Sequence, residues 1–375
     1  MADARTVEAW LKGLPGADEL LFWPPPASLY TVARLYHGLT LDVPASWREA
    51  WDTKVWRWTL GRDGRPRPLD ASETVATRLH DAAMDRLVRD YIDPGRSVTV
   101  GFMGGHDIPR ADPAFARVAL LARALRRRGF KIVTGGGPGL MEAANFGAFM
   151  APHADADLDR ALETLRAAPS FDGDHDKAVA ERHKQAWISS AARVRQSQLG
   201  RWDAEPREGG DSLGIPTWYY GSEPPNLFAS VSGKYFMNSL REDGLVSIAN
   251  GGLVFAKGAA GTVQEVFQNA SYNYYRGAGV GATPMVFLGA DFWNPCPPAD
   301  ATADAPLDPR RKPVFPLIAK LAADADPTFS PGVLLSDDAG EIAEFLVSHN
   351  RARAGDRQAD ARLARVNSLP APCRL

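Results

Sequence analysis

The sequence predicts an α/β fold: a doubly wound, mostly parallel, Rossmann-like sheet that follows a mainly helical N-terminal extension. Two observations support this prediction. From residue 97 onward, short apolar runs typical of buried strands alternate with helical stretches, the pattern of βα units in a parallel sheet. Glycine-rich turns follow three of these runs, at 104–105, 135–139 and 258–261. Because such turns share the carboxyl edge of a parallel sheet, we expect a ligand there.

Residues 1–95 form the predicted extension. Six of the ten tryptophans lie in it, at positions 10, 23, 47, 51, 56 and 58. We expect helices and loops that pack on the main domain, with the tryptophans serving burial rather than a ligand cage, since large aromatic side chains mostly stabilise cores. A helix over 72–91 leads out of the extension, with Leu79, Leu87, Val88 and Tyr91 facing inward.

The predicted main domain covers residues 96–350, and a solvated tail follows at 351–375. Its strands are predicted at 97–103, 130–134, 216–220, 252–256, 284–288 and 333–335. Its helices are predicted at 112–128, from about 140, at 233–248, from about 262 and at 339–349. Residues 151–215 are polar and charged, and we expect them to form an insertion with helical pieces.

The helix over 112–128 has the clearest pattern. Five apolar side chains recur at helical spacing along one face: Phe115, Val118, Ala119, Ala122 and Leu125. Three arginines, at 126–128, precede Gly129, where cations and a glycine favour a helix C-terminus. We therefore interpret these arginines as solvated charges that offset the helix dipole, not as a nucleic-acid patch.

Composition excludes several functional classes. The net charge of −2 gives no general attraction to nucleic acid or to anionic membranes, and no apolar run reaches the length of a membrane span. Two cysteines, Cys296 and Cys373, provide no disulfide framework, and the first residues lack a signal peptide's apolar region. These features predict a cytoplasmic protein. His153, His175 and His183 lack metal-ligand spacing, so we expect no metal site.

The stretch from 252 to 265 carries the strongest functional signal. An apolar strand runs into a loop of small residues that opens directly onto a helix, an arrangement that binds phosphate through unpaired backbone N–H groups. Glu265 lies one turn into this helix, beside the expected anion. The pair Thr262 and Glu265 also fits a capping box, which satisfies helix donors without any ligand. Both interpretations stay open at this point.

Two further turns are candidates. The loop at 135–139 departs from a dinucleotide fingerprint, because Glu142 stands where a third glycine belongs, and no Walker A motif occurs, so we expect no nicotinamide cofactor and no ATPase chemistry of that type. This loop suits either a mononucleotide or close packing of a strand on a helix. His106 follows Gly104 and Gly105 at the end of the first strand, where it is either a ligand-binding or a capping residue.

Four segments in order match the motifs of one known family. Residues 104–108 read Gly-Gly-His-Asp-Ile, 137–143 read Gly-Pro-Gly-Leu-Met-Glu-Ala, 223–226 read Glu-Pro-Pro-Asn, and 258–265 read Gly-Ala-Ala-Gly-Thr-Val-Gln-Glu. They resemble the Lonely Guy-type phosphoribohydrolases, and most closely the bacterial nucleotide 5′-monophosphate nucleosidases. The resemblance covers about residues 97–350.

This resemblance implies an enzyme that hydrolyses the N-glycosidic bond of nucleoside 5′-monophosphates without a cofactor. It implies a homo-oligomer, with Arg241 and Glu265 as the catalytic pair. It also implies a set of substrate-binding residues: Gly104, Gly105, His106, Gly136, Gly137, Gly139, Glu142, Glu223, Asn226, Lys257, Gly258, Ala259, Ala260, Gly261 and Thr262. The family's Pro-Gly-Gly is replaced here by Lys257-Gly258-Ala259. The alternative function is a non-catalytic nucleotide or cofactor carrier or sensor on the same fold.

Overall fold

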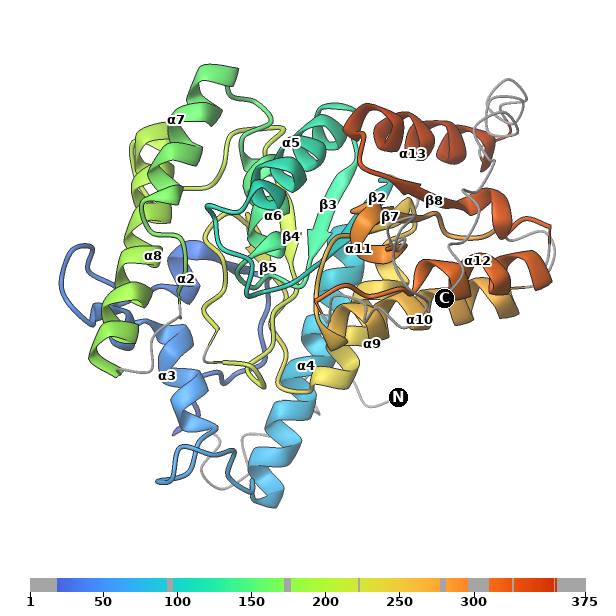
Figure 1. The fold of residues 1–375 in the computed structure, drawn as a ribbon. Coiled ribbons are helices and arrows are strands. Elements are labelled where there is room, and N and C mark those ends of the chain that lie inside the picture. Colours follow the sequence, from blue (N-terminus) through green and yellow to red (C-terminus); the bar gives the residue numbers. More distant parts are fainter. Residues whose placement is uncertain are drawn as a thin grey trace.

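The computed structural model describes residues 19–92, 97–171, 177–221, 223–276, 281–295, 310–325, 327–353 and 355. Within these residues one eight-stranded sheet has the order β1-β5-β4-β3-β2-β6-β7-β8, and only the β1–β5 pair is antiparallel. The predicted α/β fold with a mostly parallel, doubly wound sheet is therefore confirmed (Figure 1). Cys296, Cys373, His175 and Trp10 lie outside the described residues.

The elements have the following bounds. The strands are β1 Tyr30–Thr31, β2 Thr99–Met103, β3 Lys131–Thr134, β4 Ser212–Gly214, β5 Val231–Ser232, β6 Gly252–Phe255, β7 Met285–Leu288 and β8 Val333–Ser336. The helices are α2 Val32–Leu35, η2 Ser46–Glu49, α3 Trp51–Trp58, α4 Ala71–Ile92, α5 Pro113–Arg127, α6 Leu140–Phe149, α7 Asp155–Arg166, α8 Lys177–Leu199, α9 Asn238–Ile248, α10 Ala260–Tyr275, α11 Ala290–Trp293, α12 Phe315–Asp324, η3 Ser330–Gly332 and α13 Ala339–Arg353.

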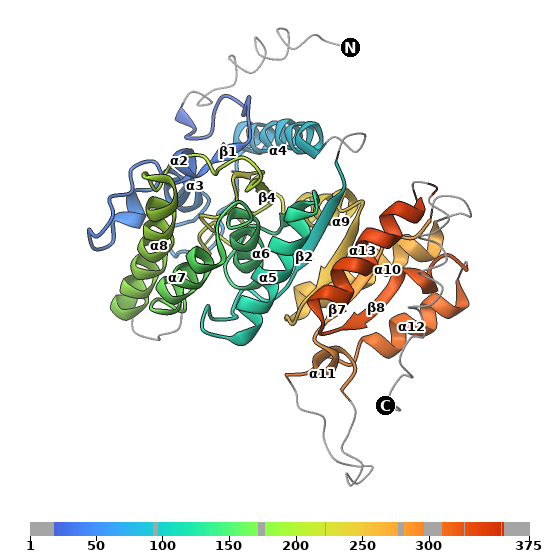
Figure 2. The same ribbon diagram turned by 90° about the horizontal axis from the view of Figure 1, so that it is seen from above.

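Helices cover both faces of the sheet (Figure 2). Helices α5, α6 and α13 pack together on one face, while α9, α10 and α12 form the other layer, with α4 against α9. Every residue of β2, β6 and β7 is buried, as expected for strands covered on both faces. In α5 the Asp112 carboxylate caps the first turn at 2.8 Å from the Ala114 nitrogen, and all five predicted core residues are buried.

The predicted strand at 216–220 is wrong. The strand of this region is β4, which ends at Gly214, and Thr217 makes only an isolated bridge to Tyr235. Pro216 has no N–H to donate to a ladder. Of the aromatic residues after it, Trp218 is buried and donates from Nε1 to Asp52 of the N-terminal segment (the described residues 19–92), while Tyr219 and Tyr220 are exposed. Strands β1 and β5 were not predicted, because each has only two residues and so short a run shows no alternation of apolar and polar residues.

The N-terminal segment supplies the antiparallel edge strand β1 as well as helices. Trp47 and Trp51 are buried and Trp23, Trp56 and Trp58 pack against the core, so these tryptophans serve burial as expected. The predicted inward face of α4 is partly right, since Val88 is buried and Tyr91 packs against the core, while Leu79 and Leu87 are only half-buried. The buried side chains of this helix are Ala76, Thr77, His80, Asp81, Met84, Val88 and Ile92. None of the helices in the described part of the chain is long and apolar enough to cross a membrane.

Candidate functional site

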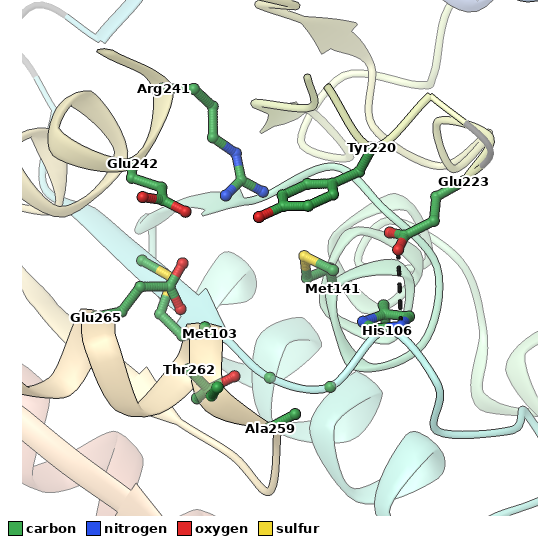
Figure 3. Close-up of a pocket in the computed structure, with 14 residues that line it drawn as sticks. Met103, His106, Met141, Tyr220, Glu223, Arg241, Glu242, Ala259, Thr262 and Glu265 are labelled. Carbon is green, nitrogen blue, oxygen red and sulfur yellow. Dashed lines mark ion pairs between the residues drawn. The ribbon is translucent and has the colours of Figure 1, made fainter. Parts of the chain in front are cut away.

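A pocket of about 260 Å³ opens at the carboxyl edge of β2 and β6 (Figure 3). Its fourteen lining residues come from the β2 turn, the starts of α6, α9 and α10, and the segment before β5. They are Met103, Gly104, Gly105, His106, Met141, Tyr220, Glu223, Arg241, Glu242, Ala259, Ala260, Gly261, Thr262 and Glu265. The pocket therefore lies at the edge of the sheet that the glycine-rich turns predicted.

Backbone hydrogen bonds join the glycine-rich turns beneath the pocket. The Gly105 N–H donates to the Lys257 carbonyl at 2.9 Å, and the Leu140 N–H donates to the Gly105 carbonyl at 3.0 Å. At Gly139 φ is +67° and a Cβ atom would lie 2.2 Å from the Gly105 oxygen, so only glycine fits there. Gly139 thus permits close packing of two turns without itself lining the pocket.

Helix α10 begins one turn earlier than a capping box at Thr262 requires. Its N-cap is Ala259, no side chain caps it, and Thr262 is buried at the third helical position. The capping interpretation of Thr262 and Glu265 is therefore wrong. The first N–H groups of the helix, at 260–262, have no acceptor within the helix, and all three residues line the pocket. This leaves an anion-binding geometry at the pocket wall.

Glu265 faces the pocket from the second turn of α10 (Figure 3). The pKa of its carboxyl is raised from 4.5 to about 7, mainly because burial penalises the charged form; the Arg241 guanidinium opposes this rise and the Glu242 charge adds to it. The side chain stays partly open to the pocket. A carboxyl with a pKa near neutrality can both accept and donate a proton at physiological pH.

Arg241 lies across the pocket from Glu265, on α9 (Figure 3). Its Nε donates to the Ile215 carbonyl at 2.8 Å and its Nη2 to the Gly135 carbonyl at 3.3 Å, so the buried guanidinium is fixed by the backbone. Among the described residues, no carboxylate oxygen lies within 4.0 Å of the Arg241 guanidinium, so Arg241 forms no ion pair with any of them. The cation is therefore held in place while its remaining donors face the pocket.

The opposite end of the pocket carries a second carboxyl. Glu223 Oε1 lies 3.6 Å from His106 Nε2 (Figure 3). Burial raises the pKa of Glu223, and the nearby charges of His106 and Arg241 oppose that rise. Tyr220 projects between this end and Arg241, with its hydroxyl toward the middle of the pocket.

Ten of the lining residues belong to the set predicted from the sequence, and four do not. The four are Met103, Met141, Tyr220 and Glu242. A sequence signal exists for each, since Met103 and Glu242 directly neighbour predicted residues, Met141 lies inside a quoted motif, and Tyr220 stands three residues before Glu223.

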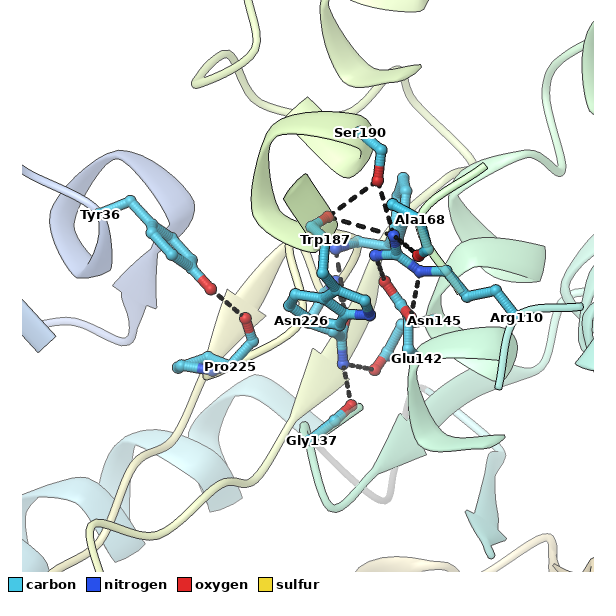
Figure 4. Close-up of polar contacts among 12 residues, drawn as sticks. Tyr36, Arg110, Gly137, Glu142, Asn145, Ala168, Trp187, Ser190, Pro225 and Asn226 are labelled. Atoms are coloured by element: carbon cyan, nitrogen blue, oxygen red, sulfur yellow. Dashed lines mark hydrogen bonds and ion pairs between the residues drawn. The ribbon is translucent and has the colours of Figure 1, made fainter. Parts of the chain in front are cut away.

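The other seven predicted residues do not line this pocket. Four of them are the glycines 136, 137, 139 and 258. Glu142 is fully buried and pairs with Arg110, whose Nε donates to it at 2.9 Å (Figure 4). Asn226 donates to the Gly137 carbonyl at 3.2 Å, and Lys257 pairs with Asp112 at 2.7 Å. In the structure these side chains hold the surrounding turns together.

Within the described residues, no group of three His, Cys, Asp or Glu side chains is arranged to hold a metal ion. Compared with models of known protein families and with curated protein sequences, the chain matches none of them. A functional assignment therefore rests on the chemistry of the pocket and on the motif resemblance.

Proposed function

We propose that this protein hydrolyses the N-glycosidic bond of nucleoside 5′-monophosphates, giving free base and ribose 5-phosphate. The observation that supports it best is the pairing of a helix N-terminus with Glu265, whose pKa is raised to about 7, in one pocket. The first group suits a phosphate, and the second suits proton transfer one helical turn away. A pocket of about 260 Å³ suits one mononucleotide rather than a polymer.

The proposed reaction passes through an oxocarbenium-like sugar. A water oxygen bonds to the anomeric carbon while the carbon–nitrogen bond breaks and its electron pair stays on the base. Glu265 accepts the water proton as a carboxylate and stabilises the positive charge on the ribose. The departing base then takes up that proton from Glu265, which returns the carboxylate to its starting state.

Arg241 is a binding group in this scheme, because a guanidinium is always protonated and donates no proton. Its lack of an ion pair with Glu265 favours a role in holding the phosphate or the departing base over a role in orienting Glu265. Binding energy from the phosphate then positions the sugar over Glu265.

A panel of nucleoside 5′-monophosphates, with chromatographic detection of free base and of ribose 5-phosphate, tests the proposal. We expect stoichiometric release of both products from at least one nucleotide. Tight nucleotide binding without release of base would instead support the alternative of a carrier or sensor. A pure binder also has no need of a carboxyl tuned to neutral pH.

Arg241→Ala is expected to lower kcat/KM about 10-fold or more, since a charge-assisted contact to substrate is worth ~1.5–3 kcal/mol. It is also expected to move the midpoint of the pH profile of kcat/KM above pH 7, because the guanidinium holds the pKa of Glu265 down. The pH dependence of kcat/KM measures both effects, with Arg241→Lys as the variant that keeps the charge.

The double variant of Arg241→Ala with Glu265→Gln tests whether the two residues act as a unit. If they do, its kcat/KM is little lower than that of either single variant. If the losses of the two single variants instead multiply, the residues have no shared role.

We also propose a homo-oligomer, as the family resemblance implies. Leu240, Tyr272, Tyr274 and Tyr275 are large side chains left exposed on α9 and α10. Light scattering at micromolar concentration is expected to give at least twice the chain mass of 40.6 kDa. A single species of 40.6 kDa would contradict this expectation.

A further inference from the structure

One wall of the pocket rests on the N-terminal segment. Tyr220 and Glu223 belong to the residues at 218–221 and 223–226, here called the pocket loop. The loop lies outside any helix or strand, and its internal backbone bonds are local, from Gly221 to Trp218 at 3.1 Å and from Glu223 to Tyr220 at 2.9 Å. Its position is therefore set mainly by the groups against which it packs.

Tyr36 makes the first of these contacts. Its side chain is 2% exposed, and its hydroxyl donates to the Pro225 carbonyl (Figure 4). On the other side, the Asn226 N–H donates to the Gly136 carbonyl at 2.9 Å. The end of the pocket loop that follows Glu223 is thus held between the N-terminal segment and a glycine-rich turn.

Trp56 makes the second contact. A Cβ atom at Gly221 would lie 2.1 Å from Cδ1 of the Trp56 indole, so the ring packs directly on this glycine. Gly221 follows Tyr220 in the chain. The indole therefore limits where the backbone that carries Tyr220 can lie.

Asp52 makes the third contact. It accepts a hydrogen bond from Trp218 Nε1 at 2.9 Å and pairs with Lys234 at 2.6 Å. Lys234 is fully buried, and its charge acts on Glu223 by favouring the carboxylate. A buried charge without its partner is costly, so the pair holds Asp52 in place. The hydrogen bond from Trp218 to Asp52 then fixes the start of the loop against α3.

We propose that Tyr36, Asp52 and Trp56 of the N-terminal segment are positioning residues, which hold the pocket loop so that Tyr220 and Glu223 face the substrate. The change in KM expected from this positioning rests on the proposed function. The position of the loop itself concerns only the fold of this chain and is independent of that function.

Tyr36→Phe tests the proposal, with Tyr30→Phe as the matched control. Both side chains are buried in the N-terminal segment, but the Tyr30 hydroxyl bonds to His80 Nε2 at 2.7 Å and not to the loop. The Tyr30 ring does pack edge-on against Trp218, but phenylalanine keeps that ring, so only the hydroxyl is lost. For Tyr36→Phe we expect KM to rise roughly 3- to 10-fold, the range that one neutral hydrogen bond is worth, with kcat nearly unchanged. We expect faster amide hydrogen exchange in the pocket loop as well. Tyr30→Phe is expected to change neither.

Gly221→Ala is the second variant, because its new methyl group must displace the Trp56 ring. Gly244→Ala is its control, since a Cβ atom there meets nothing within 4 Å. We expect Gly221→Ala to raise KM and loop exchange more than Tyr36→Phe does, and Gly244→Ala to raise neither.

The proposal is overturned if loop exchange and KM in Tyr36→Phe and Gly221→Ala match those of their controls. If the unmodified protein releases no base from any nucleotide, the proposed function fails on its own. Loop exchange, together with calorimetric binding of ribose 5-phosphate to the same variants, then still decides whether the N-terminal segment positions the loop.

Discussion

Glu265→Gln is expected to lower kcat/KM by about 10²- to 10⁴-fold, the usual contribution of a general acid or base. Glutamine keeps the size and hydrogen-bonding capacity of the side chain and removes only its ability to ionise. Glu163→Gln is the matched control, because this glutamate lies exposed on α7, away from the pocket. Circular dichroism and a melting curve for both variants show whether the fold is retained.

The pH dependence of activity gives a second measurement of the same residue. Because its pKa is about 7, Glu265 becomes a carboxylate as pH rises through neutrality. If it acts as the base, kcat/KM rises with pH to a plateau above about pH 8, and this rise is absent from the residual activity of Glu265→Gln.

Stability responds in the opposite sense. A carboxyl whose pKa is raised from 4.5 to about 7 in the folded protein binds more protons folded than unfolded across that interval. Its contribution to the free energy of unfolding is therefore lost as pH rises from about 4.5 to 7. Glu265→Gln removes this loss, so at pH 8 the variant is expected to melt at the same or a higher temperature. A variant that melts early and turns over normally would contradict a catalytic role.

The order of strands and helices in the main domain could be predicted because buried parallel strands and amphipathic helices leave periodic patterns. Helix α5 shows this well: a capping Asp112, five core residues in register and terminal arginines all agree. The segment at 216–220 misled because an aromatic run indicates burial without saying what buries it. Trp218 contacts Asp52, a partner 166 residues away, and no local pattern records such a contact.

The pocket was only partly predictable. Turns that act through their backbone are recognisable from glycines, and the predicted turns do reach the pocket, at 104–105 and at 259–261. A motif, however, does not tell which of its side chains faces the ligand. In the first turn of α6, Met141 lines the pocket while Glu142, one residue on, points into the core toward Arg110. The direction of α6, which decides between them, depends on its packing against α5 and the strands β2, β3 and β4.

The second large expected effect concerns the phosphate. Backbone N–H groups at the start of α10 are the proposed donors, and each charge-assisted hydrogen bond is worth ~1.5–3 kcal/mol. Two or three of them separate a nucleoside 5′-monophosphate from its nucleoside by at least about 10²-fold in kcat/KM. Lys257 is not counted among them, because it pairs with Asp112. The measurement is kcat/KM for each nucleoside beside its 5′-monophosphate.

A proline can remove one of these donors without removing the helix. Ala260 is the first residue of α10 and follows an extended Ala259, the backbone setting that a proline accepts. Ala260→Pro is expected to lower kcat/KM for the monophosphate about 10-fold or more, the loss of one charge-assisted bond, with little effect on the nucleoside. Ala339→Pro makes the same change at the start of α13, which does not line the pocket, and is expected to change kcat/KM for neither substrate. Equal kcat/KM values for nucleoside and monophosphate in the unmodified protein would contradict the proposed phosphate site. A helix N-terminus that binds the phosphate must favour the charged substrate over the uncharged one.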